Sequence, residues 1–344
     1  MKRVKKDRLV LDLRPLNEYD HIIVSLSGGK DSVAMLLDVM ERCDAAGIPR
    51  DRIEAWHQDV DGSQEGEAFM DWPVTPSYCE ALCRVLGVTL YFQWRIGGFE
   101  REMLREDCPT APARFQLPDG TIGTVGGERG RGTRRKFPQV SADLTVRWCS
   151  AYLKIDVARR AIANDPRFRN KRVLYLSGER AEESAARSCY LPSEAHATNL
   201  APVGKRPRFF RQVDHSRPIL RWKEAEVWAV LERHRINPHP CYWLGFGRAS
   251  CRFCIFGDAH QFATGKALAP QAFRKILDYE TEFGVTIHRG ETIAQRAARG
   301  QSYLIPAMAA ALSETRAYPL ENIMVPEGQW KLPPGAFKHC GGPS

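Results

Sequence analysis

The chain of 344 residues alternates short apolar runs with stretches whose apolar positions recur at helical spacing. The short runs are rich in β-branched residues and predict strands at residues 22–24, 52–56, 88–92 and 172–176. Strands separated by helical stretches are typical of a parallel sheet covered by helices. We therefore expect an α/β fold, a Rossmann-like parallel sheet with helices on both faces.

The helical patterns divide the chain into two parts. One predicted helix begins near residue 31, and another covers residues 67–86 with Pro73 and Pro76 interrupting it. Further predicted helices cover residues 222–235, 273–283 and 291–299. Beyond about residue 304 the sequence is rich in proline and less clearly patterned. We expect an α/β domain over residues 1–220 and a mainly helical part, carrying a C-x-x-C motif, over residues 221–344.

The most informative loop follows the first predicted strand and reads Ser27-Gly28-Gly29-Lys30-Asp31-Ser32. The two glycines let a phosphate approach the backbone closely. The N–H groups of the helix that follows, together with the Lys30 ammonium, favour an anion at the same place. The sequence therefore predicts a nucleotide phosphate site at residues 27–32.

Two other nucleotide motifs are excluded at this loop. A Walker A loop needs a glycine five residues before Gly29, where valine stands, and the dinucleotide fingerprint G-x-G-x-x-G is absent. The loop resembles the S-G-G-x-D-S signature of the PP-loop ATP pyrophosphatases. This resemblance implies that the chain binds ATP and splits it to AMP and pyrophosphate.

Two further loops are expected beside the first one, because ligands of parallel sheets bind at the carboxyl ends of the strands. Residues 57–62 follow the second predicted strand and contain Asp59 and Asp61, which we expect to hold a metal ion or a ribose. Gly178 and Arg180 follow the strand at residues 172–176. All three loops would converge on one crevice.

Charge and cysteine content narrow the class of partner. Fifty Lys and Arg against 41 Asp and Glu give a net charge of +9, which suits a nucleotide or a nucleic acid. Residues 108–139 are basic and glycine-rich, and are either a solvated loop or a flap that closes on phosphates. With no signal peptide or membrane-length apolar run evident, we expect a cytoplasmic protein without a membrane partner.

Four of the ten cysteines have a spacing that suggests chemistry. Cys251 and Cys254 form a C-x-x-C, and a distant Cys149 would close a metal site, with Cys241 as a possible fourth ligand. Such a site would hold a [4Fe-4S] cluster, or zinc completed by His239 or His260. A helix turn or a redox pair is the alternative explanation of the C-x-x-C.

Five segments occur together in an order that resembles the phosphoadenosine phosphosulfate (PAPS) reductase family. They span about residues 20–260 and comprise residues 27–32, 147–154, 177–184, 217–222 and 242–254. The resemblance implies an adenine nucleotide α-hydrolase-like fold, with Arg180 near the anionic groups of the nucleotide. It also implies that the cysteines of iron–sulfur members hold a [4Fe-4S] cluster.

Three departures from that family change the expected reaction. Cys149 is followed by Ser150, where iron–sulfur reductases have a Cys-Cys pair, and residues 27–32 are intact, where assimilatory reductases have a degenerate loop. The tail carries Cys340 in Lys-His-Cys-Gly-Gly, not in the Glu-Cys-Gly-Leu-His of the reductases. The chain is thus more similar to the ATP pyrophosphatase branch, whose enzymes place sulfur in DNA backbones or tRNA.

Three hypotheses follow. The first is an ATP- and Mg²⁺-dependent sulfur-transfer enzyme with Lys30, Asp31 and Arg180 as catalytic residues, a nucleic-acid acceptor and a sulfur-donor protein. The second is a sulfonucleotide reductase that forms sulfite and uses Cys340. The third is a nucleic-acid-binding module with an inactive nucleotide site.

Overall fold

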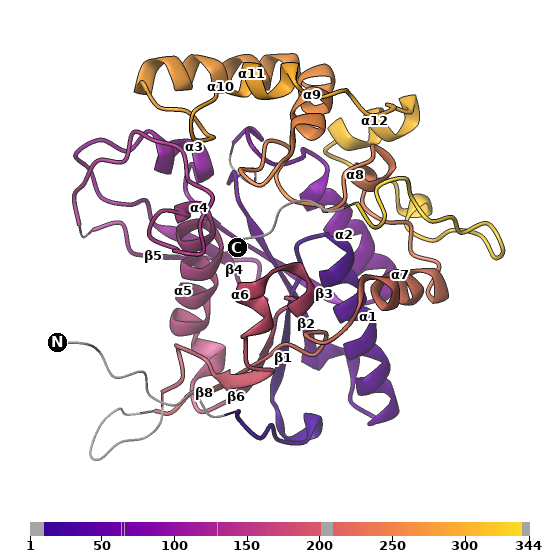
Figure 1. The fold of residues 1–344 in the computed structure, drawn as a ribbon. Helices are drawn as coiled ribbons and strands as arrows, with labels where there is room; N and C mark the ends of the chain where they lie inside the picture. Colours follow the sequence, from indigo (N-terminus) through magenta and orange to yellow (C-terminus); the bar gives the residue numbers. More distant parts are fainter. Residues whose placement is uncertain (1–9, 63, 65, 129, 201–208, 339–344) are drawn as a thin grey trace.

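A computed structural model describes residues 10–62, 64, 66–128, 130–200 and 209–338. Its strands are β1 His21–Ser25, β2 Ile53–Asp59, β3 Thr89–Arg95, β4 Ala113–Gln116, β5 Ile122–Val125, β6 Arg172–Leu176, β7 Ser193–Ala195 and β8 Gln212–Ser216. They form one sheet in the order β5-β4-β3-β2-β1-β6-β8-β7 (Figure 1). The central strands β3, β2, β1, β6 and β8 are parallel, and the outer pairings are antiparallel. The predicted α/β fold is confirmed.

The direction of travel along the sheet reverses at β1. The chain moves from β1 outward to β2 and β3, and then returns to β6 on the other side of β1. In open parallel sheets a crevice forms at the carboxyl ends of the strands where the order reverses. Residues 27–32 follow β1 and residues 177–180 follow β6, so the topology alone brings these two loops together.

Helices cover both faces of the sheet because β1 is apolar on both sides. Ile22 and Val24 pack with α1 Lys30–Ala45, α2 Thr75–Leu86 and α7 Glu224–Arg233, while Ile23 packs with α5 Asp156–Asn164. The side chains of Ile22, Ile23 and Val24 are fully buried. Helix α7, which belongs to the second predicted domain, shares its hydrophobic cluster with α1.

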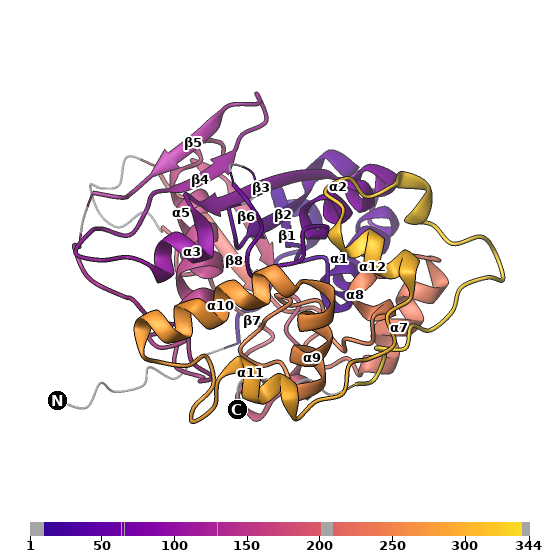
Figure 2. The ribbon, with the colours of Figure 1, turned by 90° about the horizontal axis from the view of Figure 1, so that it is seen from above.

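The C-terminal part of the described chain is mainly helical, as predicted. It contains α8 Pro240–Trp243, α9 Ala259–Leu268, α10 Pro270–Phe283, α11 Ile293–Ala298 and α12 Ala307–Glu314. Helices α9 to α11 lie together, at the top of Figure 1, and α10 lies next to α3 Gly98–Met103 in both views (Figures 1 and 2). Within the described ranges, no helix combines the length and the apolar character needed to cross a membrane.

Two sequence predictions differ from the structure. The helix predicted over residues 67–86 begins only at Thr75, because the Asp61 carboxylate accepts the backbone N–H groups of Phe69, Met70 and Asp71 and holds them in a loop. The polar region at residues 108–139 contains the antiparallel pair β4 and β5, and is therefore not a loop throughout.

Candidate functional site

The loop between β1 and α1 is a tight turn that provides no side-chain cap of its own for the start of the helix. Gly28 has φ +77, a left-handed conformation that favours glycine, and Gly29 is the N-cap residue without any side-chain cap. The Ser32 hydroxyl donates to the Gly29 carbonyl (2.9 Å) and accepts the N–H of Ser27 (3.1 Å). The loop is thus closed from within, and the N-terminus of α1 points at the crevice with its partial positive charge.

Lys30 is buried and held by the C-terminal part of the chain. Its backbone N–H donates to the Tyr242 hydroxyl (2.9 Å), and its Nζ donates to the Gly247 carbonyl (3.0 Å). The same Nζ lies 3.6 Å from carboxylate oxygens of both Asp31 and Glu224. The ammonium is therefore fixed in place between two carboxylates.

Arg180 completes this charged group from the loop after β6. Its Nε donates to Asp31 Oδ1 (2.5 Å) and its Nη1 to Glu182 Oε2 (2.6 Å), while the side chain is only 3% exposed. Burial alone would raise the pKa of Asp31, but the charges of Lys30 and Arg180 bring it below its ordinary value. Gly178 packs against the start of α1, where an added Cβ would lie 3.4 Å from the Asp31 carbonyl. The structure thus brings Lys30, Asp31, Gly178 and Arg180 together.

A polar network that the sequence analysis missed anchors the loop after β6. The Ser177 hydroxyl donates to Glu179 (2.5 Å) and lies 2.6 Å from His215 Nε2. Burial and the charge of Arg217 lower the pKa of His215 to about 4, so this ring is neutral at pH 7. Its Nδ1 faces Arg217 (3.4 Å) and accepts, which leaves Nε2–H to donate to Ser177. His215 and Arg217 therefore position the loop that carries Arg180.

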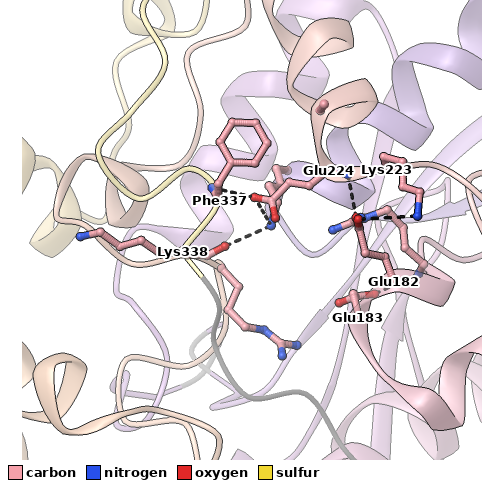
Figure 3. A pocket seen from close by; sticks show the side chains of 11 residues that line it. Glu182, Glu183, Lys223, Glu224, Phe337 and Lys338 are labelled. Atoms are coloured by element: carbon pink, nitrogen blue, oxygen red, sulfur yellow. Dashed lines mark hydrogen bonds and ion pairs between the residues drawn. The ribbon is translucent and has the colours of Figure 1, made fainter.

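A pocket of about 320 Å³ opens beside these residues (Figure 3). Five cationic side chains line it, from Lys30, Arg180, Lys223, Arg248 and Lys338, against three glutamates. Figure 3 shows the Glu224 carboxylate close to the backbone of Phe337, whose N–H donates to it (3.1 Å). An excess of cations around a helix N-terminus suits a polyphosphate.

The pocket residues that come from the C-terminal part were not predicted from the sequence. Glu224 begins α7, Arg248 follows α8, and Lys338 lies near the end of the described chain. Arg248 stands inside the motif segment 242–254, which was a usable signal. No local pattern distinguishes Glu224 or Lys338 from ordinary surface charges.

A second group of acids gathers at the end of β2. Asp61 Oδ2 accepts the N–H groups of Phe69, Met70 and Asp71 at 2.8 to 2.9 Å, while Asp59 Oδ1 accepts the N–H of Asp61 (3.2 Å). Burial, followed by the charge of Asp71, raises the pKa of Asp61 to about 7. These carboxylates shape the loop after β2, and a role of Asp59 or Asp61 toward ribose or metal stays a prediction.

The four cysteines predicted as metal ligands do not form one group. Cys149, Cys251 and Cys254 border the same hydrophobic cluster, whereas Cys241 is fully buried in the other cluster with Tyr242. Burial and the neighbouring Cys254 raise the pKa of Cys149 to about 11, and burial and Asp71 raise that of Cys251.

These thiols do not match a metal site in the structure. In the part of the chain that the structure describes, no group of three or more His, Cys, Asp or Glu side chains could hold a metal ion. His239, expected to complete a zinc site, instead contacts Thr75 and the N–H of Cys241, and burial lowers its pKa to about 3. His260 is hydrogen-bonded to the backbone of Gln301. The residues present therefore do not fit a [4Fe-4S] cluster or zinc, and we derive no step through either.

The basic region at residues 108–139 is tied to the body of the protein by ion pairs. The pairs are Arg131 with Asp107 (2.9 Å), Arg134 with Glu102 (2.8 Å) and Arg135 with Glu282 (2.6 Å). In addition, the guanidinium carbon of Arg134 lies 4.7 Å from the centroid of the Trp148 ring. These three arginines are therefore matched by acids. Arg129 and the tail cysteine Cys340 lie outside the described residues.

Residues 128–256 match the family model described as the phosphoadenosine phosphosulfate reductase domain. This match confirms the resemblance predicted from the motifs. It covers Arg180, Arg248 and the C-x-x-C, but begins after residues 27–32.

Two relatives and one solved structure are similar to the chain. An uncharacterized 37.8 kDa protein of Escherichia phage 186 is 27% identical over 298 residues, 82% of this chain and 81% of the relative. An uncharacterized protein of Methanocaldococcus jannaschii is 26% identical over 138 residues, 40% of this chain and 30% of the relative. FMN adenylyltransferase of Candida glabrata in complex with ATP is 12% identical with a TM-score of 0.36, over 68% of this chain and 52% of that one.

Proposed function

We propose that the chain binds ATP in the pocket beside residues 27–32 and splits it to AMP and pyrophosphate, activating an acceptor for sulfur transfer. The observation that carries this proposal is the grouping of Lys30, Asp31 and Arg180 at the reversal point of the sheet, beside a cationic pocket. This arrangement offers backbone donors, an ammonium and a guanidinium to one polyphosphate.

Each residue has a distinct role in the proposed reaction. The pyrophosphate would lie on Gly28, Gly29 and the N-terminus of α1, with Lys30 neutralising its charge. Arg180 would stabilise the charge that develops on the α-phosphate, and Asp31 keeps the guanidinium aimed at it. Mg²⁺ that came with ATP would neutralise phosphate charge, and one or two carboxylates of the chain, for which Asp59 and Asp61 stay the predicted residues, would suffice to hold it.

The bond changes define the expected products. An oxygen of the acceptor attacks the α-phosphorus of ATP, and pyrophosphate leaves with the electrons of the broken P–O bond. A sulfur nucleophile from a donor protein then attacks the acceptor atom that bears the adenylylated oxygen, and AMP leaves with that oxygen and with the electrons of the broken bond. The chain therefore holds the phosphates in place while the donor supplies the sulfur.

The test is analysis of the nucleotide products with and without nucleic acid and a sulfur source. We expect AMP and pyrophosphate, and a loss of at least about 100-fold in Lys30→Ala and Asp31→Ala. Lys171→Ala is the matched control, since this half-exposed lysine pairs with Asp20 at the start of β6. Formation of ADP and phosphate, or no pyrophosphate under any condition, would refute the proposal.

A sulfonucleotide reductase is the second candidate, because the family match covers residues 128–256. This reaction would yield sulfite from PAPS or from adenylyl sulfate and would use Cys340. Sulfite formation that Cys340→Ser abolishes, without pyrophosphate release from ATP, would favour this candidate over the first.

The proposed ATP reaction needs no iron–sulfur cluster, and the metal content can be tested separately. An anaerobic preparation that is colourless and still releases pyrophosphate agrees with the absence of a metal group among the described residues. A brown protein whose colour is lost in Cys251→Ser and Cys254→Ser would show that these cysteines hold a cluster.

A further inference from the structure

The C-terminal segment of the described chain brings one exposed aromatic ring to the pocket. Phe337 lines the pocket, with 48% of its surface exposed. It belongs to none of the hydrophobic clusters formed by the described residues, whereas its neighbour Ala336 packs against the first of them. Figure 3 shows the Phe337 ring at the edge of the side chains that line the pocket. The ring therefore has apolar area that packing within the described chain does not use.

The backbone of Phe337 has a conformation that is unfavourable for a bulky residue. Its φ is +59, in the left-handed region, where the Cβ comes too close to the backbone. Glycine would adopt this φ without strain. Strained residues persist only where the surrounding structure holds them, and they are common at ligand sites. An aromatic residue at a position that favours glycine therefore points to a use of the ring.

Contacts on both sides of Phe337 hold its backbone. The Gly335 N–H donates to the Tyr242 carbonyl (2.9 Å), and a Cβ on Gly335 would overlap the Phe246 carbonyl. The Phe337 N–H itself donates to Glu224 Oε1 (3.1 Å). These contacts fix the position of the residue and leave its ring exposed.

The same neighbours connect Phe337 to the loop at residues 27–32. Glu224 Oε1, which accepts the Phe337 N–H, lies 3.6 Å from Lys30 Nζ. Tyr242, whose carbonyl accepts the N–H of Gly335, also accepts the backbone N–H of Lys30 with its hydroxyl. The aromatic ring and the ammonium group are therefore held in one arrangement by Glu224 and Tyr242.

An exposed ring beside a group of cations suits a ligand that carries a base as well as phosphates. Phosphate oxygens bind the cations and the N-terminus of α1. A nucleobase stacks on an aromatic side chain, and this contact is favourable for every base because each has a π-face. An inorganic polyphosphate would use the cations but not the ring.

We propose that Phe337 stacks on the base of the bound nucleotide and thereby makes the pocket prefer ATP to an inorganic polyphosphate. The proposal rests on the proposed function for the identity of the ligand, since it takes this pocket as the ATP site. A base held on the ring would limit the positions that the phosphates can take beside Lys30 and Arg180. The ring takes no part in the bond changes.

The test compares the binding of ATP and of inorganic tripolyphosphate by titration calorimetry, without an acceptor or a sulfur source. In Phe337→Ala we expect the affinity for ATP to fall about tenfold, because the stacking on one base is lost. The affinity for tripolyphosphate should change less than about twofold, since it has no base. Phe337→Trp should bind ATP within about twofold of the wild type, because its ring also stacks.

Two control variants separate the ring from its surroundings. Phe337→Gly removes the ring and relaxes the positive φ, so it should bind ATP as weakly as Phe337→Ala but unfold at a higher temperature. Leu332→Ala shortens an equally exposed apolar side chain (47%) of the same segment, outside the lining of the pocket. This variant should leave both affinities unchanged.

Three results would overturn the proposal: unchanged ATP binding in Phe337→Ala, an equal loss for ATP and tripolyphosphate, or a wild type that binds ATP no more tightly than tripolyphosphate. The second result would mean that Phe337 only maintains the shape of the pocket. Failure of the proposed function gives a different result. If ATP binding depends on the ring but no pyrophosphate is released, the stacking is confirmed and the ATP reaction is refuted.

Discussion

Two groups of acids, one partly buried and one more deeply buried, lie at the carboxyl edge of the same sheet and differ in how nearby charges affect them. Beside β1 and β6, burial would raise the pKa of Asp31 and Glu179, but neighbouring Lys30, Arg180 and Arg217 bring both below their ordinary values. At the end of β2, burial prevails and raises the pKa of Asp61 to about 7.

This difference in pKa distinguishes two kinds of region. The cations of the first can exchange their anionic partners, whereas the carboxylates of the second hold a loop in place. In the first, each carboxylate faces a cation that can also bind a phosphate oxygen, so these cations are suited to exchange one anionic partner for another. In the second, Asp61 is held by backbone N–H groups and its neighbours are further acids, Asp59 and Asp71. Closeness to the crevice is therefore not enough to assign a carboxylate to the nucleotide.

The largest expected effect on stability comes from removing an ion pair in the first region. Arg180→Ala leaves Asp31 without its closest cation, and we expect a loss of about 4 kcal/mol in the free energy of unfolding. Urea denaturation at neutral pH measures it. Adding Asp31→Asn should recover part of the loss, because the carboxylate that has lost its closest cation is then replaced by a neutral amide. A double variant no more stable than Arg180→Ala would contradict the assigned pairing.

The second prediction concerns the backbone under the Asp61 loop. Gly98 has φ +50, and a Cβ there would overlap the carbonyl group of Asp61. We expect Gly98→Ala to lower the free energy of unfolding by about 3 kcal/mol. Gly87→Ala is the control, with φ +67 but open space around it, and should cost about 1 kcal/mol. Equal effects would show that the close approach is unimportant.

The third prediction is the pH dependence due to Asp61. Its pKa is raised on folding, so the folded state binds the extra proton, and stability falls as pH rises from about 4 toward 7. Between about pH 5 and about pH 6.5 the wild type should lose up to about 2 kcal/mol more than Asp61→Asn. If thermal melts show that the stability of the two proteins changes equally with pH across this range, the raised pKa of Asp61 is contradicted.

The smallest expected effect is at an exposed pair. Arg131 and Asp107 are both largely solvent-exposed, so Arg131→Ala should change the free energy of unfolding by less than about 0.5 kcal/mol. Comparison with Arg180→Ala measures what burial adds to an ion pair. If Arg131→Ala instead slows ATP turnover without changing stability, the basic region acts as a flap on the nucleotide.

The conformation of the loop at residues 27–32 was predictable because its signals are local. Ile22 to Val24 form a buried strand, Gly28 takes positive φ, and the helix begins at Lys30, all within one short segment. The strand order adds residues 177–180, since β6 returns beside β1.

Other elements were missed because their stability comes from distant partners. Strand β8 has the polar sequence Gln-Val-Asp-His-Ser and is recognisable only once it pairs with β6. The short strands β4 and β5, at one side of the sheet, lie in a region rich in glycine and charge, where composition favours a loop. Glu224 and Lys338 reach the pocket through tertiary packing, which no spacing in the sequence encodes.

The contribution of Phe337 and Lys338 to the pocket also has a consequence during synthesis on the ribosome. The first pocket residue, Lys30, is made roughly three hundred residues before the last, which corresponds to about 15–60 s at ordinary translation rates. Throughout that interval the growing chain carries residues 27–32 without the last residues of the pocket. The pocket can therefore be complete only after translation has passed residue 338, so a prematurely ended chain would have the sequence of the loop but not the finished pocket.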